Sequence, residues 1–201
     1  MTSPAYLEPY VRASRRFGAG FGSLLWASPK TQAARFRALT RCCDFQGRMI
    51  LDAGCGRADF LDFLLRREIR PAKFIGVEAM EPLAAAAEKK RHSMCSIVRG
   101  DFVDDPRLLD YSADVIVFCG SLNTLSVFDF HLILTTAWKL TGEFLVFNFL
   151  SSDALAKAEH LTWHKQDDVA RFARGITERV VVIDDYMKGD CTIGMRKPSA
   201  I

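Results

Sequence analysis

Short apolar runs alternate with stretches of helical periodicity along most of the chain. The apolar runs predict buried strands, whereas apolar residues that recur every three or four positions predict helices. From residue 47 onward, the predicted strands cover residues 49–51, 73–78, 94–99, 113–119 and 142–149. The predicted helices between them cover residues 60–65, 81–90 and 130–140. Strands that alternate with helices in this way predict a parallel, doubly wound sheet.

The last part of the chain has a different pattern. A short helix is predicted over residues 167–174, with Gly175 at its end. A β-branched run then covers residues 177–186, a tight turn follows at Lys188-Gly189-Asp190, and residues 191–196 return. This pattern is typical of a β-hairpin whose last strand is antiparallel to its neighbours. We therefore predict an α/β fold with a doubly wound, mostly parallel seven-stranded sheet and a C-terminal antiparallel hairpin.

Residues 1–46 precede the first strand and carry two helical patterns. Apolar residues recur at helical spacing over residues 7–25, and the glycines within residues 18–22 favour a break in the second half. Ser28-Pro29 is typical of a helix start, because a capping hydroxyl stands before proline in the first turn. Gly47 is a residue type that ends helices, so we expect the second helix to run close to it.

The chain is expected to divide into two parts that share one core. Its 201 residues suit a single domain, and no low-complexity linker separates the N-terminal region from the rest. We therefore expect residues 1–46 to form a helical extension packed on a Rossmann-like domain of residues 47–201. The glycines of the extension would let it move as a lid.

Composition and charge indicate where the protein acts and which partners it does not favour. No apolar run approaches the roughly 20 residues that span a bilayer, and the start, Met1-Thr2-Ser3-Pro4, lacks the charged-then-apolar pattern of a signal peptide. We therefore expect a cytoplasmic protein that does not contact membranes. The net charge of +3 is too small to favour nucleic acid as a partner.

The cysteines and histidines do not suggest a metal. None of the six cysteines forms a C-x-x-C pair, which is typical of reduced, buried thiols. His160 and His164 lie four residues apart, but no third ligand accompanies them. We expect no metal site.

A glycine turn follows the first predicted strand. Residues 49–60 run from the strand through Gly54 and Gly56 into a helix. Such a turn directs backbone N–H groups and the positive end of the helix dipole toward the carboxyl edge of the sheet. Since a side chain would hold a ligand away from the backbone, the glycines indicate a ligand site here.

The order of these features resembles the class I S-adenosylmethionine-dependent methyltransferases over residues 48–196. Its most specific part, Leu51-Asp52-Ala53-Gly54-Cys55-Gly56, is similar to the cofactor motif of that family. Ala58 stands where the family usually has a third glycine. The resemblance implies S-adenosylmethionine as cofactor and methyl transfer as the reaction.

The resemblance also assigns a cofactor-binding role to ten residues at the ends of four successive strands. In the family, the counterpart of Asp52 lies near the amino end of the cofactor, and glycines let the backbone approach the methionine moiety. A carboxylate at Glu78 can accept both ribose hydroxyl protons, and Met80 could pack on the adenine. The full set is Asp52, Gly54, Cys55, Gly56, Glu78, Met80, Asp101, Phe102, Cys119 and Gly120.

The remaining members of this set lie after the third and fourth predicted strands. Asp101 can accept a hydrogen bond from the adenine amino group, and Phe102 offers its backbone N–H and its ring. Carbonyl groups at Cys119 and Gly120 could meet the cofactor's ammonium group. Taken singly, the carboxylates could instead serve as turn or helix caps, but four strand ends with suitable residues make coincidence a poor explanation.

The segment after the fourth strand is where the methyl acceptor meets the cofactor in this family. Here it contains Ser121 and Asn123, and it lacks the Asn-Pro-Pro-Tyr or Asp-Pro-Pro-Tyr sequence of members that methylate amino nitrogens of bases or glutamine. Asn123 could orient an acceptor, but both residues could equally cap the following helix. Tyr10 and Trp26 of the extension could shape the acceptor pocket, or simply pack on the sheet.

Asn148 is a polar residue in the apolar fifth strand, and it could face the pocket or satisfy a strand edge. No catalytic residue is assigned, because methyl transfer from a sulfonium needs a base only when the nucleophile holds its proton tightly. The leading function is methylation of a small molecule. The alternatives are a cofactor-binding regulatory module without turnover, and an RNA or protein methyltransferase.

A dinucleotide oxidoreductase is a competing interpretation of the glycine turn. It requires G-x-G-x-x-G, and here the sixth position is Asp59, a carboxylate where a pyrophosphate would approach. The sequence therefore favours an adenosylmethionine site over a dinucleotide site.

Overall fold

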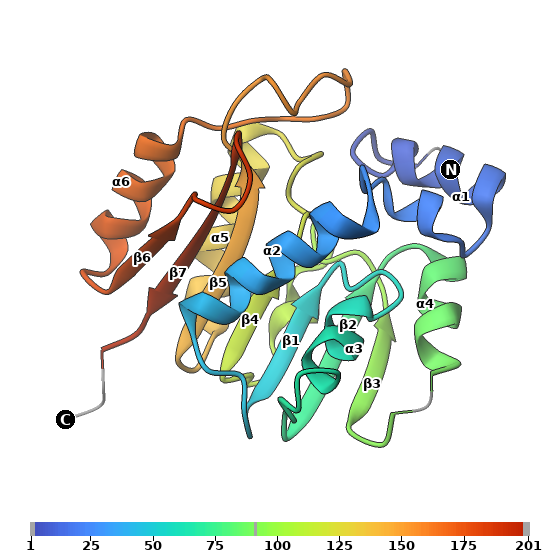
Figure 1. Ribbon diagram of the computed structural model, residues 1–201, viewed down its shortest axis with the longest axis horizontal. Coiled ribbons are helices and arrows are strands. Elements are labelled where there is room, and N and C mark those ends of the chain that lie inside the picture. Colours follow the sequence, from blue (N-terminus) through green and yellow to red (C-terminus); the bar gives the residue numbers. More distant parts are fainter. Residues whose placement is uncertain (1–2, 91, 199–201) are drawn as a thin grey trace.

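A computed structural model of the chain describes residues 3–90 and 92–198 and contains a seven-stranded sheet (Figure 1). The strand order is β3-β2-β1-β4-β5-β7-β6. The bounds of the strands are β1 Met49–Ala53, β2 Lys73–Glu78, β3 Cys95–Arg99, β4 Val115–Phe118, β5 Phe144–Leu150, β6 Val180–Ile183 and β7 Asp190–Arg196.

The directions of the strands confirm the predicted fold class. The pairs β1–β2, β2–β3, β1–β4 and β4–β5 are parallel. Strand β7 runs antiparallel to both β5 and β6. The chain leaves β1 toward β2 and β3 and then crosses back to β4 on the other side of β1. This reversal creates a crevice at the carboxyl ends of β1 and β4, where open α/β sheets bind ligands.

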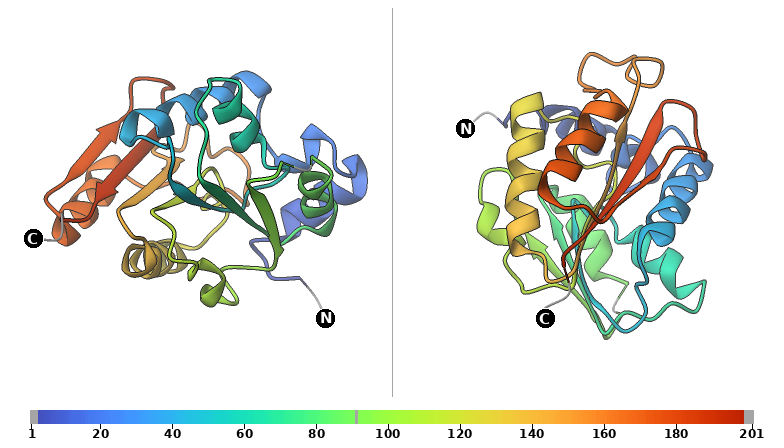
Figure 2. Two further views of the ribbon diagram at one scale, coloured as in Figure 1. Left: turned by 90° about the horizontal axis from the view of Figure 1, so that it is seen from below. Right: turned by 90° about the vertical axis from the view of Figure 1, so that its left-hand side faces the viewer.

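Helices cover both faces of the sheet, as Figure 2 shows for α2 and α5. One apolar cluster lies between the sheet and α2 and α3, and the other lies between the sheet and α5 and α6. The helix bounds are α1 Glu8–Phe17, α2 Pro29–Cys42, α3 Asp59–Leu65, α4 Glu81–Glu88, α5 Val127–Leu140 and α6 Gln166–Ile176. Short 3-10 helices occur at η1 Phe21–Leu24 and η2 Pro106–Leu109.

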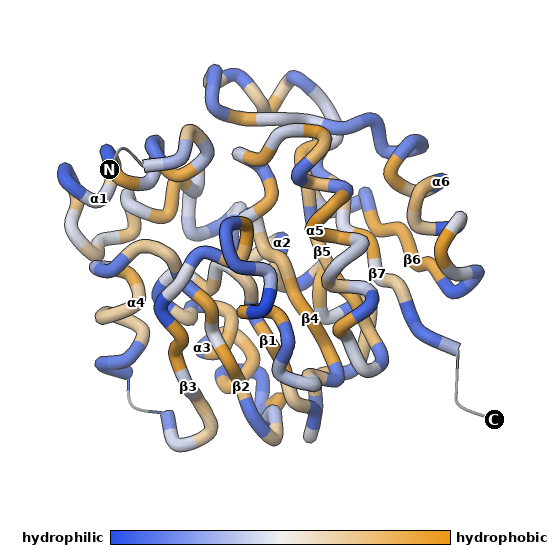
Figure 3. The backbone as a smooth tube through the Cα atoms, turned by 180° about the vertical axis from the view of Figure 1, so that it is seen from behind, coloured by the Kyte–Doolittle hydropathy of each residue, from blue (hydrophilic) through white to orange (hydrophobic). Residues whose placement is uncertain are grey.

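The central strands are apolar because they are covered on both sides. Every residue of β4 and β5 is buried, and β4 appears as a continuous hydrophobic segment in Figure 3. Strands buried on two faces need no alternation of polar and apolar residues. This explains why near-continuous apolar runs predicted them correctly.

Helices α2 and α6 end at other residues than predicted. Helix α2 begins after Ser28, whose hydroxyl accepts a hydrogen bond from Thr31 N–H, but it ends at Cys42 and not near Gly47. Phe45 is 1% exposed, so its burial fixes the segment between the helix and β1. Helix α6 continues through Gly175 to Ile176, because a glycine within a packed helix costs only about 1 kcal/mol and does not by itself end it.

Helix α1 and η1 lie beyond the carboxyl ends of the parallel strands, near the start of α4 (Figure 1). The tyrosine hydroxyl of Tyr6, just before α1, donates a hydrogen bond to Asp101 after β3, with an oxygen–oxygen distance of 2.6 Å. A break between α1 and η1 occurs at Gly18, as predicted. No helix in the described part of the chain is long and apolar enough to cross a membrane.

Candidate active site

A cavity opens at the carboxyl edge of the sheet, at the crevice beside β1 and β4. It encloses about 1040 Å³ of space, part of it open to solvent. All ten residues that the sequence assigned to the cofactor line this cavity. So do four of the five residues assigned to the acceptor, namely Tyr10, Trp26, Ser121 and Asn123.

The turn after β1 forms the floor of the cavity. The N–H groups of Gly54 and Cys55 both donate to the carbonyl oxygen of Val77 in β2, at 2.8 and 3.0 Å. Gly54 has a φ of +79°, and a Cβ at this position would lie 2.4 Å from the Cβ of Ser121. The turn therefore requires glycine for its backbone conformation and for the close approach of the segment after β4.

Ala58 ends this turn in a conformation that favours glycine. Its φ of 55° and ψ of 38° lie in the left-handed region, and it precedes the first residue of α3. A non-glycine residue in that region costs about 1–2 kcal/mol. Ala58 stands where the family that the sequence resembles usually has a third glycine, and the structure places it in a strained conformation that glycine would relieve.

Asp52 is a buried carboxyl group at the end of β1. Its side chain lines the cavity, the residue is only 2% exposed, and its Oδ1 has no hydrogen-bond partner among the described residues. Burial raises the pKa of Asp52 to about 8, and the nearby carboxylates of Glu78 and Asp59 add to the effect. An unpaired buried carboxyl group is costly, so a positively charged or hydrogen-bonding group of a ligand would be stabilised next to Asp52.

Glu78 ties the glycine turn to the segment after β2. Its two carboxylate oxygens accept hydrogen bonds from the N–H groups of Gly56 and Met80, at 2.7 and 2.8 Å. Burial raises the pKa of Glu78, and these backbone N–H groups oppose the rise. Each carboxylate oxygen can accept more than one hydrogen bond. Glu78 can therefore still accept the predicted hydrogen bonds from ribose hydroxyls.

Asp101 and Phe102 form the side of the cavity next to β3. Asp101 accepts hydrogen bonds from Val103 N–H and from the hydroxyl of Tyr6. Burial and this contact with Asp101 raise the pKa of Tyr6 above its ordinary value. The ring of Phe102 packs edge-on against Phe118 of β4, at a centroid distance of 5.5 Å. The N-terminal segment is thereby joined to the predicted adenine side of the cavity.

Asn148 supports the site from behind and does not line the cavity. It lies in β5 with no exposed surface. Its side-chain oxygen accepts a hydrogen bond from Gly120 N–H at 2.9 Å, and its nitrogen donates to the sulfur of Cys119. The sequence left open whether Asn148 faces the pocket or satisfies a strand edge. The structure shows neither, because Asn148 fixes the turn that ends β4.

Ser121 and Asn123 line the cavity but do not cap helix α5. Ser121 donates to the carbonyl oxygen of Ala53 at 2.6 Å, and Asn123 accepts from Leu150 N–H at 3.3 Å. The residue that caps α5 is Ser126, whose hydroxyl accepts from Asp129 N–H. The capping interpretation was therefore wrong, because the N-cap position of α5 is occupied by Ser126, which follows both residues in the chain.

Trp26 and Leu24 bring the N-terminal segment over the two glycine turns. A Cβ on Gly56 would lie 2.7 Å from a methyl carbon of Leu24, and one on Gly120 would lie 3.0 Å from the indole ring of Trp26. Tyr10 also lines the cavity, and burial raises its pKa to about 12. These three side chains close one side of the cavity.

Arg35 is a cavity residue that the sequence did not reveal. It lies in α2, is 7% exposed and forms an ion pair with Asp190 of β7. A signal was present, because Gln32, Arg35 and Leu39 share one face of α2 by their spacing. Sequence reasoning followed the apolar residues of this helix and missed a polar pair on its buried face.

The cavity fits S-adenosylmethionine by the chemistry of its walls. The cofactor carries a positively charged sulfonium and, at neutral pH, an ammonium group. Four carboxyl side chains line the cavity, and they belong to Asp52, Asp59, Glu78 and Asp101. The partnerless Oδ1 of Asp52 is a suitable acceptor for the ammonium group, which would favour the ionised form of Asp52.

Comparisons with known proteins agree with this chemistry. Residues 50–142 match a family model described as a methyltransferase domain. No match was found among curated proteins. Among solved structures, the fold is similar to magnesium protoporphyrin IX methyltransferase from Synechocystis PCC 6803 with bound S-adenosylhomocysteine, with a TM-score of 0.66, 12% identity, and coverage of 96% of this chain and 94% of that chain.

Two further structures extend the comparison. A putative methyltransferase in complex with the Trm112 activator from Haloferax volcanii has a TM-score of 0.71 and 14% identity, and the match covers 95% of this chain and 98% of that chain. The small RNA methyltransferase HEN1 has a TM-score of 0.66 and 13% identity, over 88% of this chain and 26% of that chain. These likenesses show the fold. Together with the domain match, they lead to one conclusion: residues 50–142 match a methyltransferase domain, and the chain has the class I, Rossmann-like methyltransferase fold.

Proposed function

We propose that the protein transfers the methyl group of S-adenosylmethionine to a small molecule enclosed by the N-terminal segment. The observation that carries this proposal is the wall formed by residues before β1. Tyr6, Leu7, Tyr10, Leu24, Leu25 and Trp26 all line the cavity. An acceptor that meets the cofactor behind such a wall has to fit within the remaining space.

Most of the predicted cofactor residues lie on the floor and on the β2–β3 side of the cavity, and the remaining two, Cys119 and Gly120, directly follow β4. Tyr10, Ser121, Asn123 and Thr124 stand on the side next to β4 and α1. We assign the acceptor to this second side. The bound cofactor supplies an electrophilic methyl group, and the protein has to align the acceptor with the S–CH3 bond and exclude water.

Tyr10 is suited to orient an acceptor and not to deprotonate it. Because burial raises its pKa to about 12, its hydroxyl keeps its proton at neutral pH. It can therefore donate a hydrogen bond to an oxygen or nitrogen of the acceptor. We expect the acceptor to be nucleophilic in the form in which it binds.

The N-terminal segment would have to move for the acceptor to enter. Its hold on the rest of the molecule includes the hydrogen bond between Tyr6 and Asp101 and the contact of Trp26 with Gly120. The backbone between α1 and η1 contains Gly18 and Gly20, which lets that segment change conformation at small cost. We propose that residues 3–26 act as a lid.

A labelled-methyl assay on cell extract tests this function. The purified protein is incubated with extract and S-adenosylmethionine carrying a labelled methyl group, and the products are separated by size. We expect label in the small-molecule fraction that depends on the added protein. Label confined to RNA or to protein would contradict the proposal and identify the acceptor as a macromolecule.

A further inference from the structure

Arg35 is the single basic residue among the described residues that line the cavity. It is 7% exposed, and its guanidinium carbon lies 4.8 Å from the centre of the Trp26 ring. A buried guanidinium has to have its N–H groups satisfied. Where each of the three nitrogens is directed therefore shows what the residue can bind.

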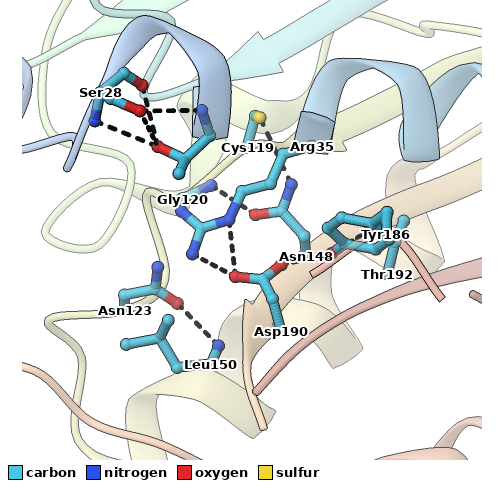
Figure 4. A network of polar contacts seen from close by, with 11 residues as sticks. Ser28, Arg35, Cys119, Gly120, Asn123, Asn148, Leu150, Tyr186, Asp190 and Thr192 are labelled. Carbon is cyan, nitrogen blue, oxygen red and sulfur yellow. Dashed lines mark hydrogen bonds and ion pairs between the residues drawn. The ribbon is translucent and has the colours of Figure 1, made fainter. Parts of the chain in front are cut away.

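Two of the three nitrogens are held by Asp190, as Figure 4 shows. Nε and Nη2 of Arg35 both donate to Oδ2 of Asp190, with a distance of 2.6 Å for Nε. The other oxygen of Asp190 accepts a hydrogen bond from the hydroxyl of Tyr186, which also contacts Thr192. Asp190 is 1% exposed. The guanidinium is thus fixed in one orientation by side chains of the C-terminal hairpin.

The third nitrogen, Nη1, is directed to the cavity. It lies 3.6 Å from the position that a Cβ on Gly120 would occupy, and Gly120 itself lines the cavity. Within residues 3–90 and 92–198, no hydrogen-bond acceptor contacts Nη1. With Trp26 on its face and Asp190 on its other edge, this nitrogen is the part of Arg35 that can meet a ligand.

The ligand group that suits Nη1 is an anion. The other charged side chains of the cavity wall are carboxylates, which would repel such a group. A guanidinium N–H group, in contrast, forms a short, charge-assisted hydrogen bond with a carboxylate. We propose that Nη1 of Arg35, held by Asp190 and Trp26, binds a carboxylate group within the cavity.

Two molecules could supply this carboxylate, and they can be told apart. One is the cofactor, through the α-carboxylate of its methionine moiety. The other is the methyl acceptor, and only this second source rests on the function proposed above. Binding measurements need no turnover, so failure to find a methylated small molecule would leave the Arg35 subsite testable.

Calorimetry on the wild type and on Arg35→Met, with three probes, distinguishes the sources. The probes are S-adenosylhomocysteine, its analogue that lacks the α-carboxyl group, and benzoate added to the S-adenosylhomocysteine complex. A cofactor source predicts that Arg35→Met binds S-adenosylhomocysteine about tenfold or more weakly, the usual effect of a lost charge-assisted hydrogen bond. It also predicts unchanged binding of the analogue. An acceptor source predicts that the variant loses benzoate alone.

Two further variants show whether a loss of binding in Arg35→Met is caused by a loss of folding. Arg35→Met leaves the buried Asp190 carboxylate without its partner, so Arg35→Met with Asp190→Asn removes both charges and should restore stability but not carboxylate binding. Arg48→Met is the matched control, because Arg48 also forms an ion pair, with Glu143, and its guanidinium carbon lies 5.1 Å from the centre of the Phe144 ring. Arg48 and Glu143 precede β1 and β5, at the opposite edge of the sheet.

The proposal is overturned by either of two results. One is wild-type affinity of the double variant for both S-adenosylhomocysteine and benzoate. The other is an equal loss of affinity for S-adenosylhomocysteine and for the analogue without the carboxyl group, which would show that Arg35 only supports the shape of the cavity.

Discussion

Asp52 is a buried carboxyl group whose proton affinity couples folding to pH. Burial raises the pKa of Asp52 in the folded protein to about 8. The pKa of an aspartate in an unfolded chain is about 3.9. Between these values, the folded state binds more protons than the unfolded state. The contribution of Asp52 to stability is therefore complete at low pH and is lost as the pH rises from about 4 toward about 8.

We predict that Asp52→Asn loses less stability than the wild type between pH 5 and pH 8. The amide cannot ionise, so this part of the pH dependence disappears. Urea unfolding at several pH values measures the difference. Asp114→Asn is the matched control, because Asp114 accepts a hydrogen bond from Met49 N–H at the other end of β1 and its replacement leaves Asp52 in place. Parallel pH profiles for Asp52→Asn and the wild type would show that Asp52 ionises in the folded protein as it does in water.

Asp52 also shows how far single residues could be interpreted from sequence. Its position after the first strand predicted its place at the cavity, which the structure shows. Its unpaired Oδ1 depends on the side chains of β2 and α3, which sequence reasoning does not arrange. Ala58 illustrates the same limit, because a left-handed φ at a non-glycine residue is set by the turn and not by the residue type.

The turn after β1 carries a prediction of its own. Gly54 and Gly47 both have positive φ, +79° and +67°, but a Cβ on Gly47 would meet no atom within 4 Å. Replacing either by alanine costs about 1–2 kcal/mol through the backbone conformation. Only Gly54→Ala also forces Ser121 away from the turn. We expect Gly54→Ala to destabilise the protein by about 2 kcal/mol more than Gly47→Ala.

Thermal unfolding and binding of S-adenosylhomocysteine measure this difference. Gly47→Ala should keep wild-type affinity, because Gly47 precedes β1 at the edge of the sheet away from the cavity. Gly54→Ala should bind more weakly, because the segment after β4 lines the cavity next to the turn. Equal stability of the two variants, with equal affinity, would mean that the close approach of Gly54 and Ser121 has no consequence.

Local patterns predicted the strands better than the helix ends. Strand β2 has the predicted bounds, because an apolar run buried on both faces is visible in the sequence alone. Helix α2 ends earlier than predicted, because the burial of Phe45 competes with the continuation of the helix. Helix α5 begins earlier than the predicted Phe130, because Ser126 is its N-cap.

The directions of the strands could be predicted from the sequence, whereas contacts between distant segments could not. Alternation of strands and helices predicted the parallel sheet, and the final hairpin predicted the antiparallel strand. The contact between Arg35 and Asp190 joins residues 155 positions apart, and no local pattern indicates it. The hydrogen bond between Tyr6 and Asp101 spans 95 positions. These two contacts place the N-terminal segment against the cavity.

The central claim is that one cavity at the carboxyl edge of the sheet binds the adenosylmethionine cofactor, with Glu78 in its wall. Calorimetric titration with S-adenosylhomocysteine tests this claim most directly. We predict one binding site per chain and an affinity at least about tenfold lower for Glu78→Ala, because charge-assisted hydrogen bonds from the ligand are lost. Glu88→Ala is the control, since Glu88 forms an exposed ion pair with Arg99 on the outside of the fold, and it should bind as the wild type does. Absence of binding at millimolar ligand, or unchanged affinity in Glu78→Ala, would contradict the account.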